Sequence, residues 1–227
     1  MLVSIPAWNS SEGMLDWDRT QIRMCFELKQ EDGNPIDEAV AGKVTTVNYL
    51  ANTFFSRFKF YASHNLVYDS LETYAYKAFL EATLMEPYEA KKTLLTSALY
   101  CEDSPGIEPN SENNEGFKKR YKKTKKGSFA TISPLHADVF TSQQFFPRMV
   151  DYRLEFFRNS DEFLLIATKA SNTKCCLNLI SAELLIHVVF PIPSFTLAYE
   201  RTLAKTAAIF CIRKVALFKS NKTEKKT

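Results

Sequence analysis

Apolar and polar residues alternate along several separate stretches of the chain, a pattern typical of strands with one face in a core and the other in water. The first such stretch covers residues 22–28, and the most regular covers residues 149–156. The alternating apolar positions of these two stretches are Ile22, Met24, Phe26, Leu28, Val150, Tyr152, Leu154 and Phe156. Less regular stretches predict further strands at residues 54–61, 66–68, 128–132, 163–166, 175–190 and 208–218.

Between the strands predicted at residues 66–68 and 128–132, the spacing of apolar residues changes from every second position to every third or fourth. Over residues 71–84 apolar residues recur every three or four positions, which predicts an amphipathic helix. The same spacing returns over residues 89–99, after Pro87 has ended the first helix. A third short helix is expected after Pro193, with Ser194 as its N-cap.

Two polar clusters predict hairpins. Residues 62–65 form a turn between the strands at 54–61 and 66–68, and residues 158–161 form a tight turn before the strand at 163–166. Strands joined by such short turns pair with each other in antiparallel fashion.

The predicted strands outnumber the helices and do not alternate strictly with them, as they would in a parallel α/β sheet. We therefore expect a mainly β fold, an antiparallel β-sandwich with short helices in the connections. One domain is expected over residues 16–218, after an N-terminal extension over residues 1–15. Residues 219–227 contain four lysines and no apolar residue, so a disordered basic tail is expected there.

The periodic pattern is lost over residues 102–127. Proline and asparagine interrupt this stretch, acidic residues dominate its first half, and basic residues dominate its second half. A long structureless loop is expected, and in a protein that assembles it would be a place for contacts between subunits.

Composition excludes several classes of protein. The 227 residues are 45% hydrophobic and include 18 Phe and 10 Tyr, which excludes a disordered chain, and 6 Gly with 9 Pro are too few for a fibrous one. The 5 Cys form no CxxC pair, which favours reduced thiols and disfavours a structural zinc site. No signal peptide and no apolar run of membrane-spanning length is found, so neither secretion nor a membrane partner is expected.

Ser133, His136 and Asp138 are the residue types of a nucleophile, a base and its orienting acid. Side chains so close together on one strand or turn point in different directions, so a structural turn is expected here. The few dispersed glycines form no phosphate-binding loop. No catalytic, cofactor-binding or metal-ligating residue is therefore predicted, and the chain is not expected to be an enzyme.

Basic residues are most dense over residues 118–126, where seven of nine positions are basic. They are Lys118, Lys119, Arg120, Lys122, Lys123, Lys125 and Lys126. This run could neutralise phosphates of DNA, with Tyr121 available for stacking, or serve as a nuclear import signal. The alternative is a solvated loop that balances the preceding acidic residues.

Most aromatic residues fit a core. Phe145 and Phe146, next to Pro147, are expected at a bend, where they would be candidates for contact with a neighbouring subunit.

Several segments occur in a characteristic order. They are VNYLANTFFSRFKFYASHNLV, TYAYKAFLEATL, AKKTLLTSALYCEDSPG, GFKKR, PLHADVF, YRLEFFRNSDEFLLI, PSFTLAYERTLAK and IRKV. This order resembles that of the major capsid proteins of Polinton (Maverick) elements, which are virus-like DNA transposons, and the resemblance extends over residues 16–218.

The resemblance implies a jelly-roll fold and a structural role in a virion shell, without catalysis or cofactor. Proteins of this family carry two jelly rolls, and the present chain corresponds to the N-terminal one. The resemblance further implies trimers that tile an icosahedral shell, a virion location, and the host nucleus or cytoplasm before assembly. A truncated or host-retained copy is equally compatible with it. The alternative function is a nucleic-acid-binding protein on a β scaffold that uses the basic loop at residues 118–126.

Overall fold

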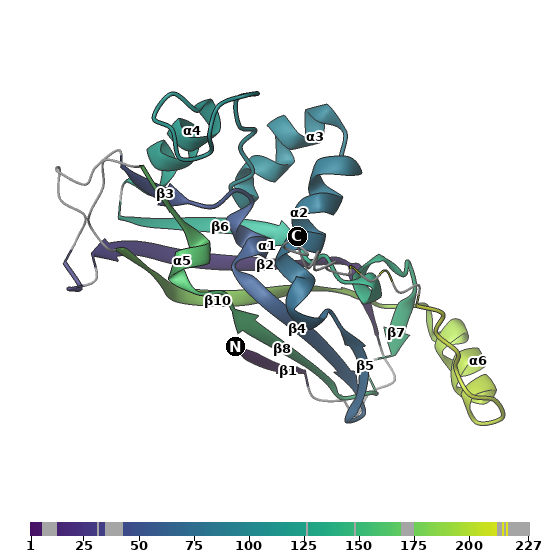
Figure 1. Cartoon of the computed structure of the whole chain (residues 1–227). Coiled ribbons are helices and arrows are strands. Elements are labelled where there is room, and N and C mark those ends of the chain that lie inside the picture. The colour runs from purple at the N-terminus through teal and green to yellow at the C-terminus, as the bar shows by residue number, and fades with distance from the viewer. Residues whose placement is uncertain are drawn as a thin grey trace, which may run out of the picture.

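Two antiparallel four-stranded sheets pack face to face in the computed structural model of the chain (Figure 1). The structure describes residues 1–5, 13–30, 32–34, 43–125, 127–147, 149–168, 175–212, 215 and 217. The first sheet has the order β1 (Leu2–Ile5), β8 (Tyr152–Arg158), β4 (Phe55–Ala62), β5 (Asn65–Asp69). The second has the order β10 (Cys175–Val189), β2 (Met14–Gln30), β6 (Ser128–Pro134), and β7 (Phe145–Pro147) pairs with the start of β2. A two-stranded sheet joins β3 (Val44–Thr46) to β9 (Leu165–Ala167).

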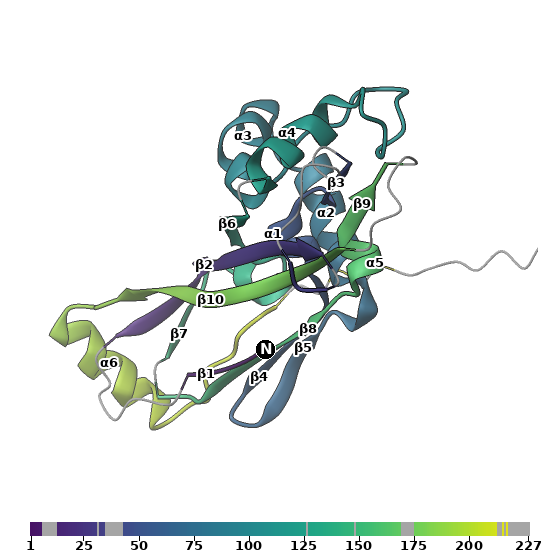
Figure 2. The ribbon, with the colours of Figure 1, turned by 90° about the vertical axis from the view of Figure 1, so that its left-hand side faces the viewer.

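The chain crosses repeatedly from one sheet to the other, and every pair of neighbouring strands is antiparallel. Figure 2 shows β2 and β10 in one layer and β4, β5 and β8 in the other. The predicted fold class, a mainly β antiparallel sandwich with short helices in the connections, is confirmed.

The core lies between the two sheets and is rich in aromatic rings. Trp17 of β2 is fully buried, and its ring meets Phe60, Phe140 and Tyr152 edge-on at centroid distances of 5.3, 5.5 and 5.4 Å. Edge-to-face pairs at this distance are favourable beyond the apolar area that they bury. Phe58 is fully buried as well, so β4 points its alternating rings into the core as its sequence pattern predicted.

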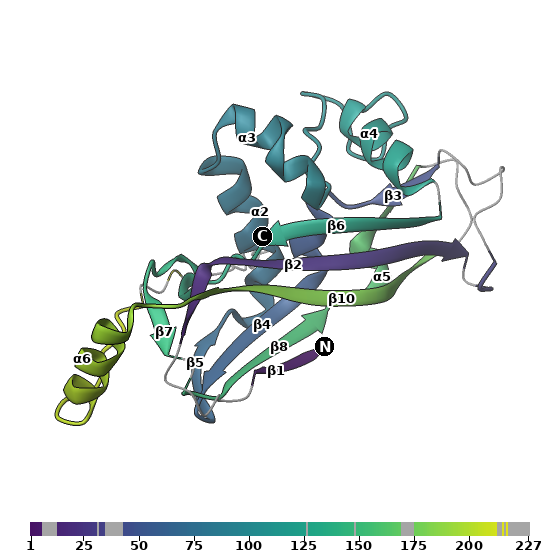
Figure 3. The same cartoon turned by 180° about the vertical axis from the view of Figure 1, so that it is seen from behind.

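Helices and single helical turns connect the strands. They are α1 (Leu50–Thr53), η1 (Leu71–Thr73), α2 (Tyr74–Leu84), α3 (Tyr88–Lys92), η2 (Leu94–Ala98), α4 (Glu115–Thr124), η3 (Asp138–Thr141), α5 (Asp161–Leu164) and α6 (Pro193–Leu203). Figure 3 shows α2, α3 and α4 gathered above β6, while α6 projects from the opposite end of the molecule. The inward face of α2 carries Ala75, Ala78 and Ala82, whose small side chains let the helix pack closely.

The helix expected over residues 89–99 is interrupted. Thr93 has φ −113° and ψ −81°, which separates α3 from the 3₁₀ turn η2. The helix after β10 begins two residues earlier than predicted, because Ile192 and not Ser194 is its N-cap, and Pro193 takes the first helical position, where proline loses no hydrogen bond.

The structureless loop expected over residues 102–127 is wrong, because α4 lies within it. The side chain of Asn114 caps this helix by accepting hydrogen bonds from the N–H groups of Gly116 and Phe117. Phe117, Arg120 and Thr124 are buried at spacings of three and four residues, so α4 is an amphipathic helix whose inward stripe is concealed in the sequence by lysines.

The predicted hairpin between residues 149–156 and 163–166 is also wrong. The single turn α5 follows β8 and redirects the chain, so β9 pairs with β3 instead of β8. The Asp161 carboxylate holds this turn in place, because it contacts Arg158 and accepts a hydrogen bond from the N–H of Leu177 at 3.1 Å.

The strand predicted over residues 208–218 is absent from the part of that stretch that the structure describes. The segment after α6 instead returns between the two layers (Figure 2). There Phe210 stacks on Phe146, with 4.6 Å between ring centroids, and the N–H of Val215 donates to Asp138 Oδ2 at 2.8 Å. The tail at residues 219–227 lies outside the described residues, and residues 2–5 of the expected N-terminal extension form β1.

Candidate nucleic-acid and subunit interfaces

The helix α4 is fixed to the body of the protein at its N-terminus. A Cβ atom at Gly116 would lie 2.2 Å from Asp103 Oδ1 and 2.9 Å from the carbonyl oxygen of Cys101, so only glycine allows the helix to approach this segment. The position of the basic residues is thus set by the packing of α4 against residues 101–103.

Arg120 is the basic residue that turns inward, and its side chain is 0% exposed. Its guanidinium donates to the carbonyl oxygens of Thr46 and Cys101, both at 3.1 Å, and forms an ion pair with Asp103 at 3.0 Å. A buried arginine with these partners joins α4 to β3 and is not accessible to a nucleic acid. It is a structural residue among the seven that sequence reasoning grouped together.

The other basic residues of the run divide into two groups. Lys118 lies near the start of α4, where its ammonium pairs with Glu115 at 2.9 Å, and Lys119 is exposed beside it. Lys122, Lys123 and Lys125 lie at the C-terminal end of the helix and line a cavity of about 660 Å³. Lys126 lies outside the described residues.

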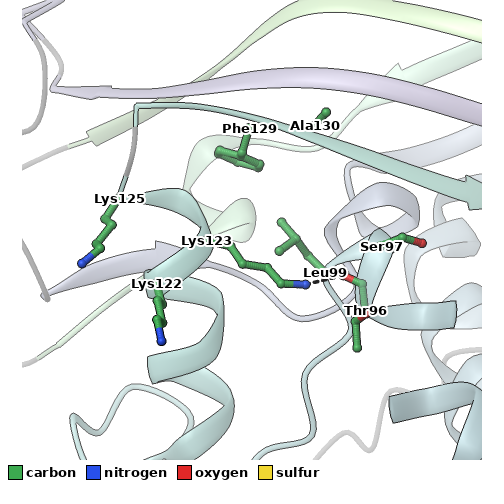
Figure 4. A pocket seen from close by; sticks show the side chains of 8 residues that line it. All are labelled: Thr96, Ser97, Leu99, Lys122, Lys123, Lys125, Phe129 and Ala130. Carbon is green, nitrogen blue, oxygen red and sulfur yellow. Dashed lines mark hydrogen bonds between the residues drawn. The ribbon is translucent and has the colours of Figure 1, made fainter. Parts of the chain in front are cut away.

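This cavity lies between the last turn of α4, the 3₁₀ turn η2 and the strand β6 (Figure 4). Leu99, Phe129 and Ala130 provide an apolar wall, and Thr96 and Ser97 complete the rim. Lys123 reaches across the rim and donates to the Thr96 carbonyl oxygen at 2.6 Å, which fixes its ammonium group at the mouth. The arrangement combines positive charge with an apolar wall that includes one aromatic ring.

The two phenylalanines at the expected subunit contact point to opposite sides of β7. Phe146 is 4% exposed and packs in the core against Phe210, whereas Phe145 is 48% exposed. Alternation along a strand separates them, so of the two rings only that of Phe145 is exposed to solvent.

Ser133 and His136 are linked through a tyrosine that sequence reasoning did not consider. His136 Nδ1 lies 2.9 Å from Glu81 Oε2, and its Nε2 lies 2.6 Å from the hydroxyl oxygen of Tyr49. The Tyr49 hydroxyl lies 3.3 Å from Ser133 Oγ. Burial raises the pKa of Tyr49 to about 12, so this hydroxyl stays neutral near pH 7.

Asp138 is not part of that chain of hydrogen bonds. Its carboxylate accepts from Lys77 at 2.5 Å, and both side chains are buried. Burial alone would lower the pKa of Lys77, but the hydrogen bond to Asp138 and the nearby Tyr68 and Glu81 outweigh it and raise that pKa. Ser133 is itself buried, and these two polar clusters join α1 and α2 to residues 133–138.

An open apolar surface lies at the β10 and α6 end of the molecule. The inward row of β10, Ala182, Leu184, Ile186 and Val188, packs against the core but remains only partly buried. Large apolar side chains are exposed along β10 and the residues that follow it: Ile180, Leu185, Phe190, Ile192, Phe195 and Leu197. A second cavity, of about 320 Å³, opens between Gly13 at the start of β2 and residues 190–200. We call residues 180–200 the C-terminal apolar surface.

Neither a metal centre nor a membrane span is found in the part of the chain that the structure describes. No group of three or more His, Cys, Asp and Glu side chains is close enough to hold a metal ion there. Within the same residues, no helix is both long and apolar enough to cross a bilayer.

No protein-family model matches the chain. The uncharacterized protein F54H12.2 of Caenorhabditis elegans is 25% identical over 187 residues, which are 79% of this chain and 42% of the worm protein. Among solved structures, PBCV-1 VP54, fitted into a cryo-EM reconstruction of the virophage Sputnik, has a TM-score of 0.47 and 10% identity, over 88% of this chain and 40% of that one. The chain thus spans less than half the length of either protein.

Proposed function

We propose that the chain is a jelly-roll unit of a virion shell protein from a virus-like DNA transposon of the Polinton (Maverick) type, or a retained copy of one. Its role is structural and non-catalytic, and its partners are other shell subunits. The observation that carries the assembly role is the C-terminal apolar surface. The order of the segments that resemble Polinton capsid proteins supports the particular kind of assembly.

The first argument is the edge of the second sheet. The strand β10 stands at the end of the strand order, so one of its edges has no strand partner among the described residues. A long exposed edge invites pairing with another chain, and proteins that remain monomeric usually protect it with charge, proline or a covering segment. Here its neighbours are exposed apolar residues such as Ile180 and Leu185.

The second argument is the helix beyond that edge. In α6 the side chains of Phe195 and Leu197 are about half exposed, and the helix projects away from the sandwich (Figure 3). Monomeric proteins rarely leave a large continuous apolar area in water, so a second folded unit is expected to cover β10 and α6. In a shell protein with two jelly rolls, that unit is the second jelly roll or a neighbouring subunit.

The proposal of a virion shell protein implies trimers, assembly in the host nucleus or cytoplasm, and a final location in the virion. Sedimentation of the purified chain over a wide concentration range tests this reading. We expect trimers or larger particles whose proportion grows with concentration and which electron microscopy resolves as regular rings or shells. A strict monomer at high concentration would contradict the proposal.

A pair of variants tests whether the C-terminal apolar surface carries the assembly. Leu185→Lys with Leu197→Lys places two charges on this surface and should leave the chain monomeric with an unchanged unfolding midpoint. Leu84→Lys with Leu94→Lys is the matched control. Both leucines are exposed, Leu84 at the end of α2 and Leu94 at the start of η2, and these elements lie away from α6 (Figure 3). Equal loss of assembly in the two double variants would exclude β10 and α6 as the interface.

The alternative function, a nucleic-acid-binding protein on a β scaffold, is favoured by a different observation. Lys122, Lys123 and Lys125 gather at one cavity instead of spreading over a loop. Binding of DNA by a chain that never assembles would support this alternative over the shell reading.

A further inference from the structure

We propose that the cavity between α4, η2 and β6 is a binding site for single-stranded nucleic acid, in which a base stacks on Phe129 and the backbone phosphates pair with the lysines at the end of α4. The site lies apart from the C-terminal apolar surface, so it does not depend on assembly.

Charge is the first reason. Lys122, Lys123 and Lys125 line the cavity, and none of the lining side chains that the structure describes is acidic. Two acidic residues packed at the start of α4 are engaged elsewhere, since Glu115 pairs with Lys118 and Asp103 pairs with buried Arg120. The cavity mouth is therefore net positive and attracts a polyanion.

Pre-organisation is the second reason. A free lysine side chain loses conformational entropy when it binds a phosphate. Lys123 is already held by the carbonyl oxygen of Thr96, and an ammonium group has two further N–H donors to offer. The structure of α4, fixed at Gly116 and Arg120, places the other two lysines on the same turn.

The apolar wall is the third reason, and it separates a nucleic acid from a simple anion. Phe129 and Leu99 face a volume of about 660 Å³, which lies within the range of sites for small organic ligands and is far more than one phosphate ion needs. Stacking on an aromatic ring is available to an unpaired base but not to a base inside a duplex. Single strands are therefore preferred to double strands and to acidic peptides.

Fluorescence anisotropy with a labelled oligothymidine of about 12 nucleotides tests the proposal, since sites of this kind span roughly 4 to 16 nucleotides. The competitors are a duplex of the same length, an abasic oligomer with the same phosphates, poly-glutamate and inorganic phosphate. We expect the single strand to bind at least about tenfold more tightly than the abasic oligomer, because only the former can stack. Equal binding of the two would overturn the stacking role of Phe129, and failure of the parent chain to bind in about 50 mM salt would overturn the site.

Matched variants test whether the oligonucleotide binds at the cavity. Lys122→Gln with Lys125→Gln should weaken binding about tenfold or more and reduce the slope of log affinity against log salt by about one unit. Lys118→Gln with Lys119→Gln removes the same charge from the same helix outside the cavity and should change binding less than about threefold. Equal effects of the two double variants would show diffuse attraction to a basic helix and overturn the site.

Phe129→Leu separates stacking from charge. This variant should weaken binding of oligothymidine about tenfold while leaving the salt slope and the affinity for the abasic oligomer unchanged. Near-ultraviolet circular dichroism and the unfolding midpoint verify that each variant is folded. Unchanged oligothymidine binding by folded Phe129→Leu would reject base stacking here.

Discussion

The strands β2 and β10 are hydrogen-bonded along most of their length, yet their inward side chains have different environments. Ile22 lies opposite Leu184 and Met24 lies opposite Ala182 in the register. Both β2 residues are fully buried, whereas both β10 residues remain partly exposed. On the same face of one sheet, the side chains are thus buried at β2, which we call the closed side, and partly exposed at β10, which we call the open side.

Position in the sheet explains this difference. The strand β2 lies between β10 and β6, and its Trp17 reaches the opposite sheet. The strand β10 forms the end of its sheet, and among the described residues it has a strand neighbour on one side alone. Apolar residues at such an edge are buried only if another polypeptide segment covers them. The exposed residues of β10 are therefore the basis of the proposed assembly.

The largest expected effect on the free energy of unfolding is that of a substitution on the closed side, in β2. Phe26→Ala should lower the free energy of unfolding by roughly 3 to 5 kcal/mol, because it leaves a cavity where the ring now packs against Phe54. Denaturant unfolding followed by fluorescence measures the change. A loss below about 1 kcal/mol would mean that the β2 side is no more tightly packed than the β10 side.

A somewhat smaller effect is expected at the buried ion pair. Lys77→Met leaves the Asp138 carboxylate buried without its main partner and should cost roughly 3 kcal/mol. Lys77→Met with Asp138→Asn should recover most of this loss, because the neutral amide still offers an oxygen to the N–H of Val215. Additive losses in a double-mutant cycle would show that the two charges are not coupled.

The smallest effect is expected on the open side. Leu184→Ala should cost only about 1 kcal/mol in the monomer, since its side chain is already partly in water. The same substitution should cost more in the assembled state, as seen from a larger shift of the sedimentation equilibrium than of the unfolding midpoint. An equal effect on the sedimentation equilibrium and on the unfolding midpoint would show that β10 is not part of the assembly interface.

Much of the sandwich was predictable because its strands follow a period of two. The patterns at residues 22–28 and 54–61 led directly to β2 and β4, and the change of period at residue 71 led to α2. These elements bury one face, so their own residues carry the signal.

The candidate site was only partly predictable, because the surrounding lysines hid the buried stripe of α4. Asn114 as a cap and the spacing of Phe117, Arg120 and Thr124 were the signals that would have found the helix. The sequence suggested seven equivalent basic residues, but the fold divides the six that the structure describes into buried Arg120, two exposed lysines near the start of α4 and three lysines at a cavity. That division depends on residues such as Thr96, which lies 27 positions before its partner Lys123 in the sequence.

Local residue patterns alone determined the mainly β class, the β4–β5 hairpin and the helix α2, because each of these depends on periodicity and turn chemistry within a short stretch. Only the tertiary structure decided that β9 pairs with β3, that Arg120 turns inward, and that Tyr49 joins His136 to Ser133. It also decided that the inward row of β10 stays open, since burial depends on what lies opposite a side chain and not on the side chain itself.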